Sequence, residues 1–224
     1  MKNNLKILIT VVVVIVIIGI IFAYYKVEQT PINENPTATS TSTQDCSLTK
    51  SCTLDFADSN KVFSYEYNSL FTAGEGQNTP STNWRVNTTQ TGTLLSKVTI
   101  PKSYMPGTNF SDADLTVGRS TDINALRTCS TDAVNGEVKD GTRVIDRGDF
   151  TKFTLSDAGA GNLYDTTSYR GLVDGYCYVI EYTIHSTNIG NYSPDQGIKE
   201  FDKTKIQSDL EKMISSFQFR IIGS

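Results

Sequence analysis

Histidine occurs once in this chain, at position 185, inside the run CYVIEYTIHSTNIGNY. A Ser-His-Asp hydrolytic site would have to use His185 as its general base. Glu181 would share its face of a strand, but four residues along a strand span about 13 Å, which is too far to orient the ring. Ser186 would point to the opposite face, and the chain contains no Gly-x-Ser-x-Gly motif. We therefore predict that His185 has a structural role where a strand ends.

Oxygen donors gather in the glycine-rich stretch SDAGAGNLYD, Ser156–Asp165, which is expected to be a loop between two strands. Asp157, Asn162 and Asp165 could supply the oxygen ligands that Ca²⁺ prefers. Their spacing matches no EF-hand loop, and Gly, Asn and Asp are also the residues that tight turns use. A strand rather than a helix follows, which disfavours phosphate binding. We expect no metal and no other cofactor.

Trp84 is the only tryptophan, in the Thr-rich segment TPSTNWRVNTT. It could stack on a ligand beside tyrosines of a sheet, although a single Trp commonly anchors part of a core. Together with Asp157, Asn162, Asp165 and His185 it makes up the candidate ligand surface. No set of catalytic residues is predicted.

The four cysteines, Cys46, Cys52, Cys129 and Cys177, indicate two disulfides, for which three connectivities exist. Cys46 and Cys52 are close enough to close a small loop, which leaves Cys129 with Cys177. The alternative is a zinc site, but the chain has no Cys-x-x-Cys pair and only one His.

Alternating apolar and polar residues predict strands. In Tyr176–His185 one face carries the tyrosines and isoleucines, while Cys177, Val179, Glu181, Thr183 and His185 share the other. Val173-Asp174-Gly175 supplies a hairpin turn before this strand. Further strands are predicted at residues 61–67, 94–100, 115–120, 142–146, 149–155, 164–172 and 217–222.

Helical periodicity occurs twice, at Phe201–Phe217 and in the shorter stretch Asp122–Cys129. The first places its apolar residues along one stripe, as a helix lying on a sheet requires. The predicted fold class is therefore α+β: an antiparallel β-sheet with one long C-terminal amphipathic helix and a short helix packed on it.

The N-terminal residues predict a membrane anchor. Residues 7–25 carry no charge, and at about 1.5 Å per residue they span roughly 28 Å, close to the ~30 Å hydrocarbon core. The lysines in residues 1–6 place that end in the cytoplasm. A cleaved signal peptide is the alternative, but bulky residues stand where a cleavage site needs small ones. A pilin stem would carry a Glu that this segment lacks.

Residues 26–45 are rich in Thr, Ser and Pro and predict an unfolded tether. Residues 46–224 then form one extracytoplasmic domain. Three basic and three acidic residues precede Cys46, so this domain keeps the net charge of −4 of the whole chain. That charge argues against nucleic acid as a partner.

The run FSYEYNSLF at Phe63–Phe71 resembles the opening strand of PsbP/Mog1-like domains, and the Tyr-rich strand followed by a helix ending in ISSFQF is similar to their C-terminal part. Asn68 stands where that family usually has Pro. The resemblance implies an α+β sandwich that serves as a binding or accessory module and brings no catalytic residues with it.

Two hypotheses for function follow. The first is a single-pass cell-membrane protein whose extracytoplasmic domain is a non-catalytic binding or accessory module for an unknown extracytoplasmic protein or small ligand. The alternative is an extracytoplasmic hydrolase with an unrecognised active site. A shallow groove lined by tyrosines would favour binding, and a deep polar cleft that holds His185 with acidic residues would favour the enzyme.

Overall fold

A computed structural model of the chain describes residues 51–60 and 62–220. The predicted anchor (residues 7–25), the tether (residues 26–45) and Cys46 lie outside the described residues and stay predictions. Within the described ranges, no helix is long and apolar enough to cross a bilayer.

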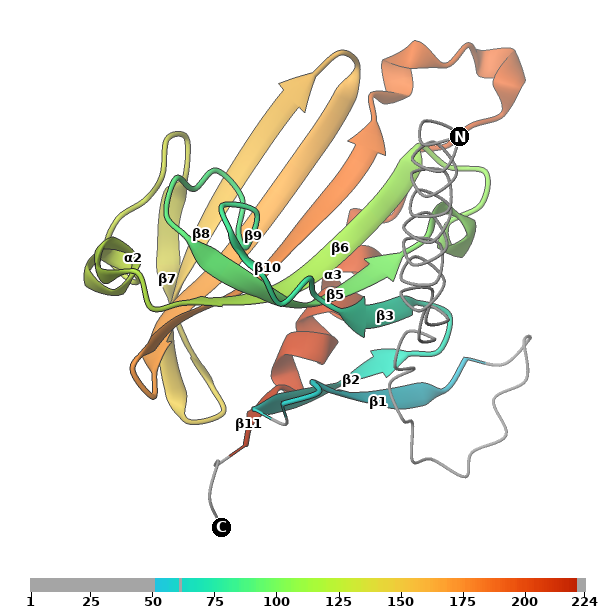
Figure 1. Cartoon of the computed structure of the whole chain (residues 1–224). Helices are drawn as coiled ribbons and strands as arrows, with labels where there is room; N and C mark the ends of the chain where they lie inside the picture. Colours follow the sequence, from blue (N-terminus) through green and yellow to red (C-terminus); the bar gives the residue numbers. More distant parts are fainter. Residues whose placement is uncertain (1–50, 61, 221–224) are drawn as a thin grey trace, which may run out of the picture. The chain divides into compact units, whose positions relative to one another are not determined.

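The described residues form two antiparallel sheets (Figure 1). The larger sheet has the strand order β3-β5-β6-β10-β9-β8-β7, with β4 paired to β5, and the smaller sheet has the order β1-β2-β11. The strands of the larger sheet are β3 (Thr72–Glu75), β4 (Pro80–Ser81), β5 (Gly92–Ile100), β6 (Phe110–Ser120), β7 (Val138–Ile145), β8 (Gly148–Gly159), β9 (Asn162–Val173) and β10 (Tyr176–Thr187). Those of the smaller sheet are β1 (Thr53–Ala57), β2 (Phe63–Asn68) and β11 (Gln218–Phe219). The prediction of a mostly antiparallel β-sheet domain is confirmed.

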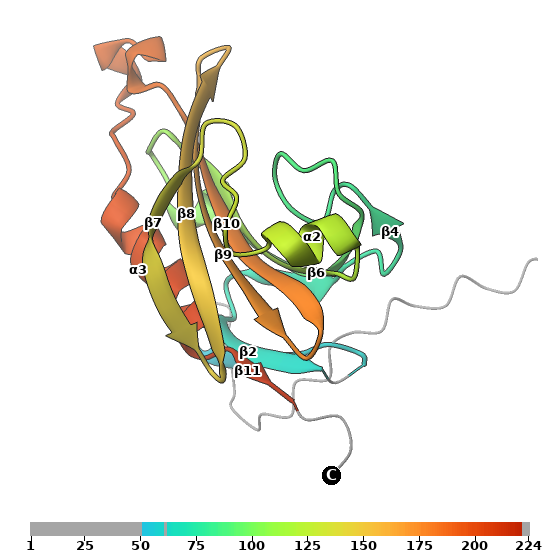
Figure 2. The same cartoon turned by 90° about the vertical axis from the view of Figure 1, so that its left-hand side faces the viewer.

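Two α-helices occur in the part of the chain that the structure describes, α2 (Ile123–Thr128) and α3 (Lys203–Ser215), and they lie on opposite sides of the larger sheet (Figure 2). Three short 3-10 turns, η1 (Lys102–Tyr104), η2 (Ile189–Asn191) and η3 (Pro194–Gln196), lie in the connections. We call the α3 side the inner face and the α2 side the outer face.

Strand β10 lies near the centre of the larger sheet, between β6 and β9. Its apolar positions Tyr178, Ile180, Tyr182 and Ile184 are all buried in the main core with α3, as the alternation predicts. The hairpin turn before β10 is also confirmed, because Asp174 (φ 49°) and Gly175 (φ 78°) both adopt the positive φ of a two-residue turn.

Helix α3 begins at Asp202, whose carboxylate accepts a hydrogen bond from the Lys205 amide at 3.0 Å. Its buried side chains recur at helical spacing and form a stripe that faces the sheet: Ile206, Leu210, Met213 and Ile214. The helix ends at Ser215, and only Ser216 and Phe217 separate it from β11, so the chain passes directly from the helix into the smaller sheet.

The smaller sheet completes the core with aromatic rings. Phe63 stacks on Phe217 at a centroid distance of 5.1 Å, and Phe56 stacks on Tyr65 at 4.9 Å. The Tyr65 hydroxyl donates to Ser96 Oγ of β5 at 3.2 Å, which joins the two sheets. Burial raises the pKa of Tyr65 well above its ordinary value, so it stays a neutral donor.

The outer face is covered by α2 and the segment before β5. Cys129, which follows α2, forms a disulfide with Cys177 of β10 across a Cα–Cα distance of 5.7 Å. This confirms the predicted pairing. The predicted Cys46–Cys52 bond stays a prediction, because Cys46 lies outside the described residues.

Several boundaries differ from the predictions. Ser156–Asp165 is not a loop: β8 continues to Gly159, β9 starts at Asn162, and only Ala160 and Gly161 form the turn, both with positive φ. Strands β1, β3 and β4 were not predicted, and they are short. In such strands two to five residues leave too little alternation to read. β11 covers only part of the predicted strand 217–222, and residues 221 and 222 lie outside the described range.

Candidate functional site

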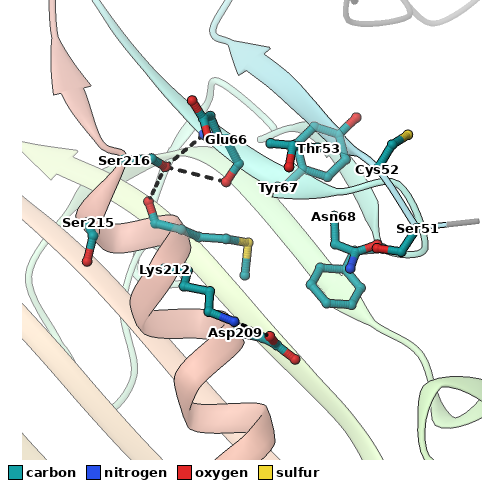
Figure 3. A pocket seen from close by; sticks show the side chains of 12 residues that line it. Ser51, Cys52, Thr53, Glu66, Tyr67, Asn68, Asp209, Lys212, Ser215 and Ser216 are labelled. Carbon is teal, nitrogen blue, oxygen red and sulfur yellow. Dashed lines mark hydrogen bonds and ion pairs between the residues drawn. The ribbon is translucent and has the colours of Figure 1, made fainter. Parts of the chain in front are cut away.

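A groove of about 540 Å³ lies between the smaller sheet and the C-terminal half of α3 (Figure 3). Its floor is apolar, made by the buried side chains of Phe71 and Met213. Half-buried Tyr67 and the exposed Lys212 line it from opposite sides. The groove therefore combines an apolar floor with a polar rim, which is the make-up of a protein-binding surface.

Asp209 holds one side of the groove in place. Its carboxylate accepts hydrogen bonds from the Tyr104 hydroxyl at 2.8 Å, from Lys205 Nζ at 3.0 Å and from Lys212 Nζ at 3.3 Å. Burial would raise the pKa of Asp209, but the hydrogen bonds from Lys205 and Tyr104 outweigh it and hold the pKa below its usual value. The carboxylate is therefore ionised, and Lys205 and Lys212 already balance its charge before any ligand arrives.

The end of α3 is tied to β2 at the other side of the groove. Ser216 Oγ accepts a hydrogen bond from the Glu66 amide at 2.9 Å and donates to the Met213 carbonyl at 2.8 Å (Figure 3). The first of these bonds joins residues that are 150 positions apart in the sequence. The groove walls are thus fixed relative to each other.

The outer face buries a cluster of charges that sequence reasoning missed. Arg170 of β9 is fully buried and forms an ion pair with Glu137, whose side chain is 1% exposed. Arg170 also donates to Ser168 Oγ at 3.0 Å and lies over the Phe153 ring at 4.4 Å from its centroid. Each of the three guanidinium nitrogens thus has a hydrogen-bond partner, because Arg170 also donates to the Asp132 carbonyl at 3.4 Å, and burial of a charge requires such partners.

Glu181 of β10 is the second buried acid on this face, and it is 2% exposed. One carboxylate oxygen accepts a hydrogen bond from the Val86 amide at 2.7 Å. Burial raises the pKa of Glu181, while the Val86 amide and the neighbouring Ser168 hydroxyl act in the opposite direction. The alternation pattern placed Glu181 on the mixed face of β10. A charge in the middle of a central strand was the signal that could have marked it.

His185 lies within β10 rather than at its end, since the strand continues to Thr187. Its Nδ1 is 3.1 Å from Asp112 Oδ2, and its Nε2 is 2.9 Å from Asn162 Oδ1. The ring also stacks on Tyr164 at a centroid distance of 4.6 Å. Both ring nitrogens are engaged, and His185 does not line the groove.

The other members of the predicted ligand surface are divided between the two faces. Asp157 bonds to the adjacent Ala158 amide, and Asn162 contacts His185. Asp165 accepts from Ser156 Oγ and from Lys203 Nζ of α3, both at 2.6 Å. The hydrogen bonds from Lys203 and Ser156 outweigh burial and lower the pKa of Asp165. The three oxygen donors therefore do not converge. Among the described residues no group of three or more His, Cys, Asp or Glu could hold a metal ion.

Trp84 is not a ligand platform, because its side chain is fully buried under the outer face with Cys129, Cys177 and Val179. Its indole Nε1 donates to the Gln90 carbonyl at 2.8 Å. Gly118 of β6 lies so close that an added Cβ would stand 2.4 Å from the Trp84 carbonyl oxygen. Trp84 is a core anchor, the alternative that sequence reasoning left open.

Comparison with known proteins gives little. No protein-family model matches the chain, and no curated protein matches it. One solved structure, of a protein from Bacteroides thetaiotaomicron VPI-5482, is similar with a TM-score of 0.39 and 11% sequence identity, over 76% of this chain and 49% of that protein. The chain thus spans about half the length of that protein, and so distant a likeness carries no argument.

Proposed function

We propose that this protein is a single-pass membrane protein whose extracytoplasmic domain is a non-catalytic binding or accessory module. The groove between β2 and α3 carries the proposal. It is open to solvent, it has an apolar floor and a polar rim, and its walls are fixed by bonds that are already made. Preorganised surfaces of this kind lose little entropy on binding.

A segment of another extracytoplasmic protein fits this groove better than an enclosed small molecule would, because small ligands are usually buried over most of their surface. The extracytoplasmic location is supported by the Cys129–Cys177 disulfide, since such bonds persist in oxidising compartments. The anchor in residues 7–25 and the resemblance to PsbP/Mog1-like domains remain part of the proposal.

Site-specific cross-linking of the full chain in membranes of the cell that makes it tests this function. A photoreactive amino acid at Lys212, whose side chain is 74% exposed, should give a light-dependent adduct of one defined mass. The control position is Val144 of β7, which is 67% exposed and does not line the groove. Equal labelling at both positions, or none at either, would contradict a binding role for the groove.

The effect of a charge change at the groove rim on partner binding gives a second test. Lys212→Glu places a carboxylate beside Asp209 and should reduce the amount of a captured partner, whereas Lys199→Glu changes the charge of the chain by the same amount outside the groove. A partner captured equally by both variants would not be bound at this groove.

A further inference from the structure

A separate pocket of about 340 Å³ lies between the end of β6, the start of β10 and β11. Two arginines line it, Arg119 of β6 and Arg220, which follows β11. The one acid of the lining, Asp174, already forms an ion pair with Arg147. In the part of the chain that the structure describes, neither Arg119 nor Arg220 has a carboxylate partner. We propose that this pocket binds a small organic anion, whose oxyanion head is held by the two guanidinium groups.

Arg119 has one edge of its guanidinium free. Its flat face lies over the Tyr176 ring, 4.5 Å from the centroid, and Nη1 donates to the Tyr178 hydroxyl at 3.3 Å. Nε and Nη2 have no hydrogen-bond partner among the described residues, and both atoms reach solvent. These two nitrogens form the side-on edge of a guanidinium, which binds both oxygens of a carboxylate or phosphate at once. The stacking on Tyr176 therefore holds Arg119 in place while its bidentate edge stays open to a ligand.

The acids near this pocket have partners of their own. Asp174 belongs to the ion pair described above. The charge of Asp58 also acts on Tyr178 of the lining, but Asp58 is 2% exposed and its carboxylate accepts hydrogen bonds from three backbone amides. Because a guanidinium does not lose its proton in proteins, Arg119 and Arg220 contribute two positive charges that no described carboxylate pairs. The lining therefore favours an anion, although the chain as a whole has a net charge of −4.

Aromatic rings form the apolar wall of the pocket. Tyr178 and Phe219 are 4% and 7% exposed and make its floor, where their rings meet edge to face at a centroid distance of 4.9 Å. Tyr176 is half-buried beside Arg119. An inorganic anion would leave these rings without contact, whereas a flat apolar group attached to the anion covers them. The volume lies within the range of about 300–1,000 Å³ that small-ligand sites occupy.

The pocket is built on central strands and is distinct from the groove of Figure 3. Arg119 lies directly opposite Tyr178 in the β6–β10 register, so the sheet fixes the two side chains relative to each other. Arg119 and Tyr176 also border an adjoining hollow of about 440 Å³ beside β4, which leaves room for a longer ligand. The pocket and the groove share no lining residue, so the anion site stands or fails independently of the proposed function.

Side-chain NMR of the full chain in detergent micelles tests the proposal. Isotopically labelled arginine gives one Nε–H signal for each arginine, and the variants below assign those of Arg119 and Arg220. Benzoate and phenyl phosphate each join an oxyanion to a ring, inorganic phosphate has only the anion, benzyl alcohol only the ring, and benzylamine a ring with a cation. Benzoate or phenyl phosphate should shift both signals saturably and bind about tenfold or more tightly than the other three probes. The tighter of the two identifies the preferred head group.

Three arginine variants locate the binding. Arg220→Gln removes one cation at an exposed position and should weaken binding, read at the Arg119 signal, by about tenfold. Arg119→Lys keeps the charge but loses the side-on pair of donors, and it should weaken binding, read at the Arg220 signal, by a similar factor. The matched control is Arg127→Gln on α2, because Arg127 is exposed, contacts only Asn124 and lies outside the lining. It should leave the affinity unchanged.

Near-ultraviolet circular dichroism of each variant verifies the fold. If Arg119→Lys did not fold, Arg220→Gln would decide, since the Arg220 side chain has no hydrogen bond within the described residues. The proposal is overturned if neither benzoate nor phenyl phosphate shifts the two signals, or if phosphate, benzyl alcohol or benzylamine binds as tightly. It is also overturned if Arg220→Gln and Arg127→Gln bind the preferred probe alike.

Discussion

The two faces of the larger sheet bury their residues by different means. The inner face packs Tyr178, Ile180, Tyr182 and Ile184 against α3 and the aromatic rings of the smaller sheet. The outer face buries a disulfide, a tryptophan, an ion pair and one further acid within the same span of β9 and β10. One face is thus held by apolar area, and the other depends on specific partners. The specific partners should tolerate substitution only in pairs.

The largest expected effect comes from breaking the outer-face ion pair. Arg170→Met would leave the Glu137 carboxylate buried without its partner, and we expect a loss of about 3–5 kcal/mol in the free energy of unfolding. The double variant Arg170→Met/Glu137→Leu removes both charges and should recover most of that loss. Urea denaturation of the three proteins measures both values. A double variant as unstable as the single one would show that the face does not depend on pairing.

Truncation of the inner face should cost slightly less. Ile180 is fully buried between the sheet and α3, so Ile180→Ala should destabilise the domain by about 2–5 kcal/mol through lost burial and the cavity left behind. Ile180→Val, which keeps most of the volume, is the matched control and should lose about 1 kcal/mol. Similar midpoints of urea unfolding for Ile180→Ala and the native chain would mean that the inner face is less well packed than its burial indicates.

Glu181 should respond in the opposite direction. Burial raises its pKa in the folded protein, so the folded state binds a proton more readily than the unfolded chain. Stability therefore falls as the pH rises through the folded pKa, and the full cost is present above it. Glu181→Gln should raise the stability at pH 7 by about 1 kcal/mol, and the gain should vanish below the ordinary carboxyl pKa of about 4.5.

Melting curves of Glu181→Gln and the native chain over a pH series verify this prediction. A variant that melts lower at pH 7 would show that the ionised carboxylate contributes to stability. The conclusion that the outer face buries this acid at a cost in stability would then be wrong.

The smallest effect is expected at His185, on the exposed part of the outer face. His185→Gln removes contacts with Asp112 and Asn162 from a side chain that is 23% exposed, and it should cost at most about 1 kcal/mol. Thermal melts and the cross-linking assay at Lys212 measure stability and binding in the same preparation. If the variant kept its melting temperature but lost its activity, the structural interpretation of His185 would be wrong and the hydrolase alternative would gain support.

Local regularities of the sequence were sufficient for much of the fold. Alternation identified β10, its inner face and its hairpin partner β9, because side chains on a strand point to opposite sides in turn. Helical spacing identified α3, and the short separation of Cys46 and Cys52 left Cys129 to pair with Cys177. The anchor at residues 7–25 likewise follows from length and composition alone, as a prediction.

Tertiary structure alone decided what lies at the sites, because those contacts join residues distant in the chain. Arg119 and Arg220 border one pocket only because the chain after α3 returns to the start of β10, and no local period records that approach. The groove between β2 and α3 forms for the same reason, since the Glu66–Ser216 bond spans 150 residues. Trp84 was ambiguous because composition cannot separate a core anchor from a platform. Ser156–Asp165 was wrongly expected to be a loop because composition cannot separate a long hairpin from a loop. The burial of Trp84 and the β8–β9 strand register, which both depend on the whole chain, determined these two features.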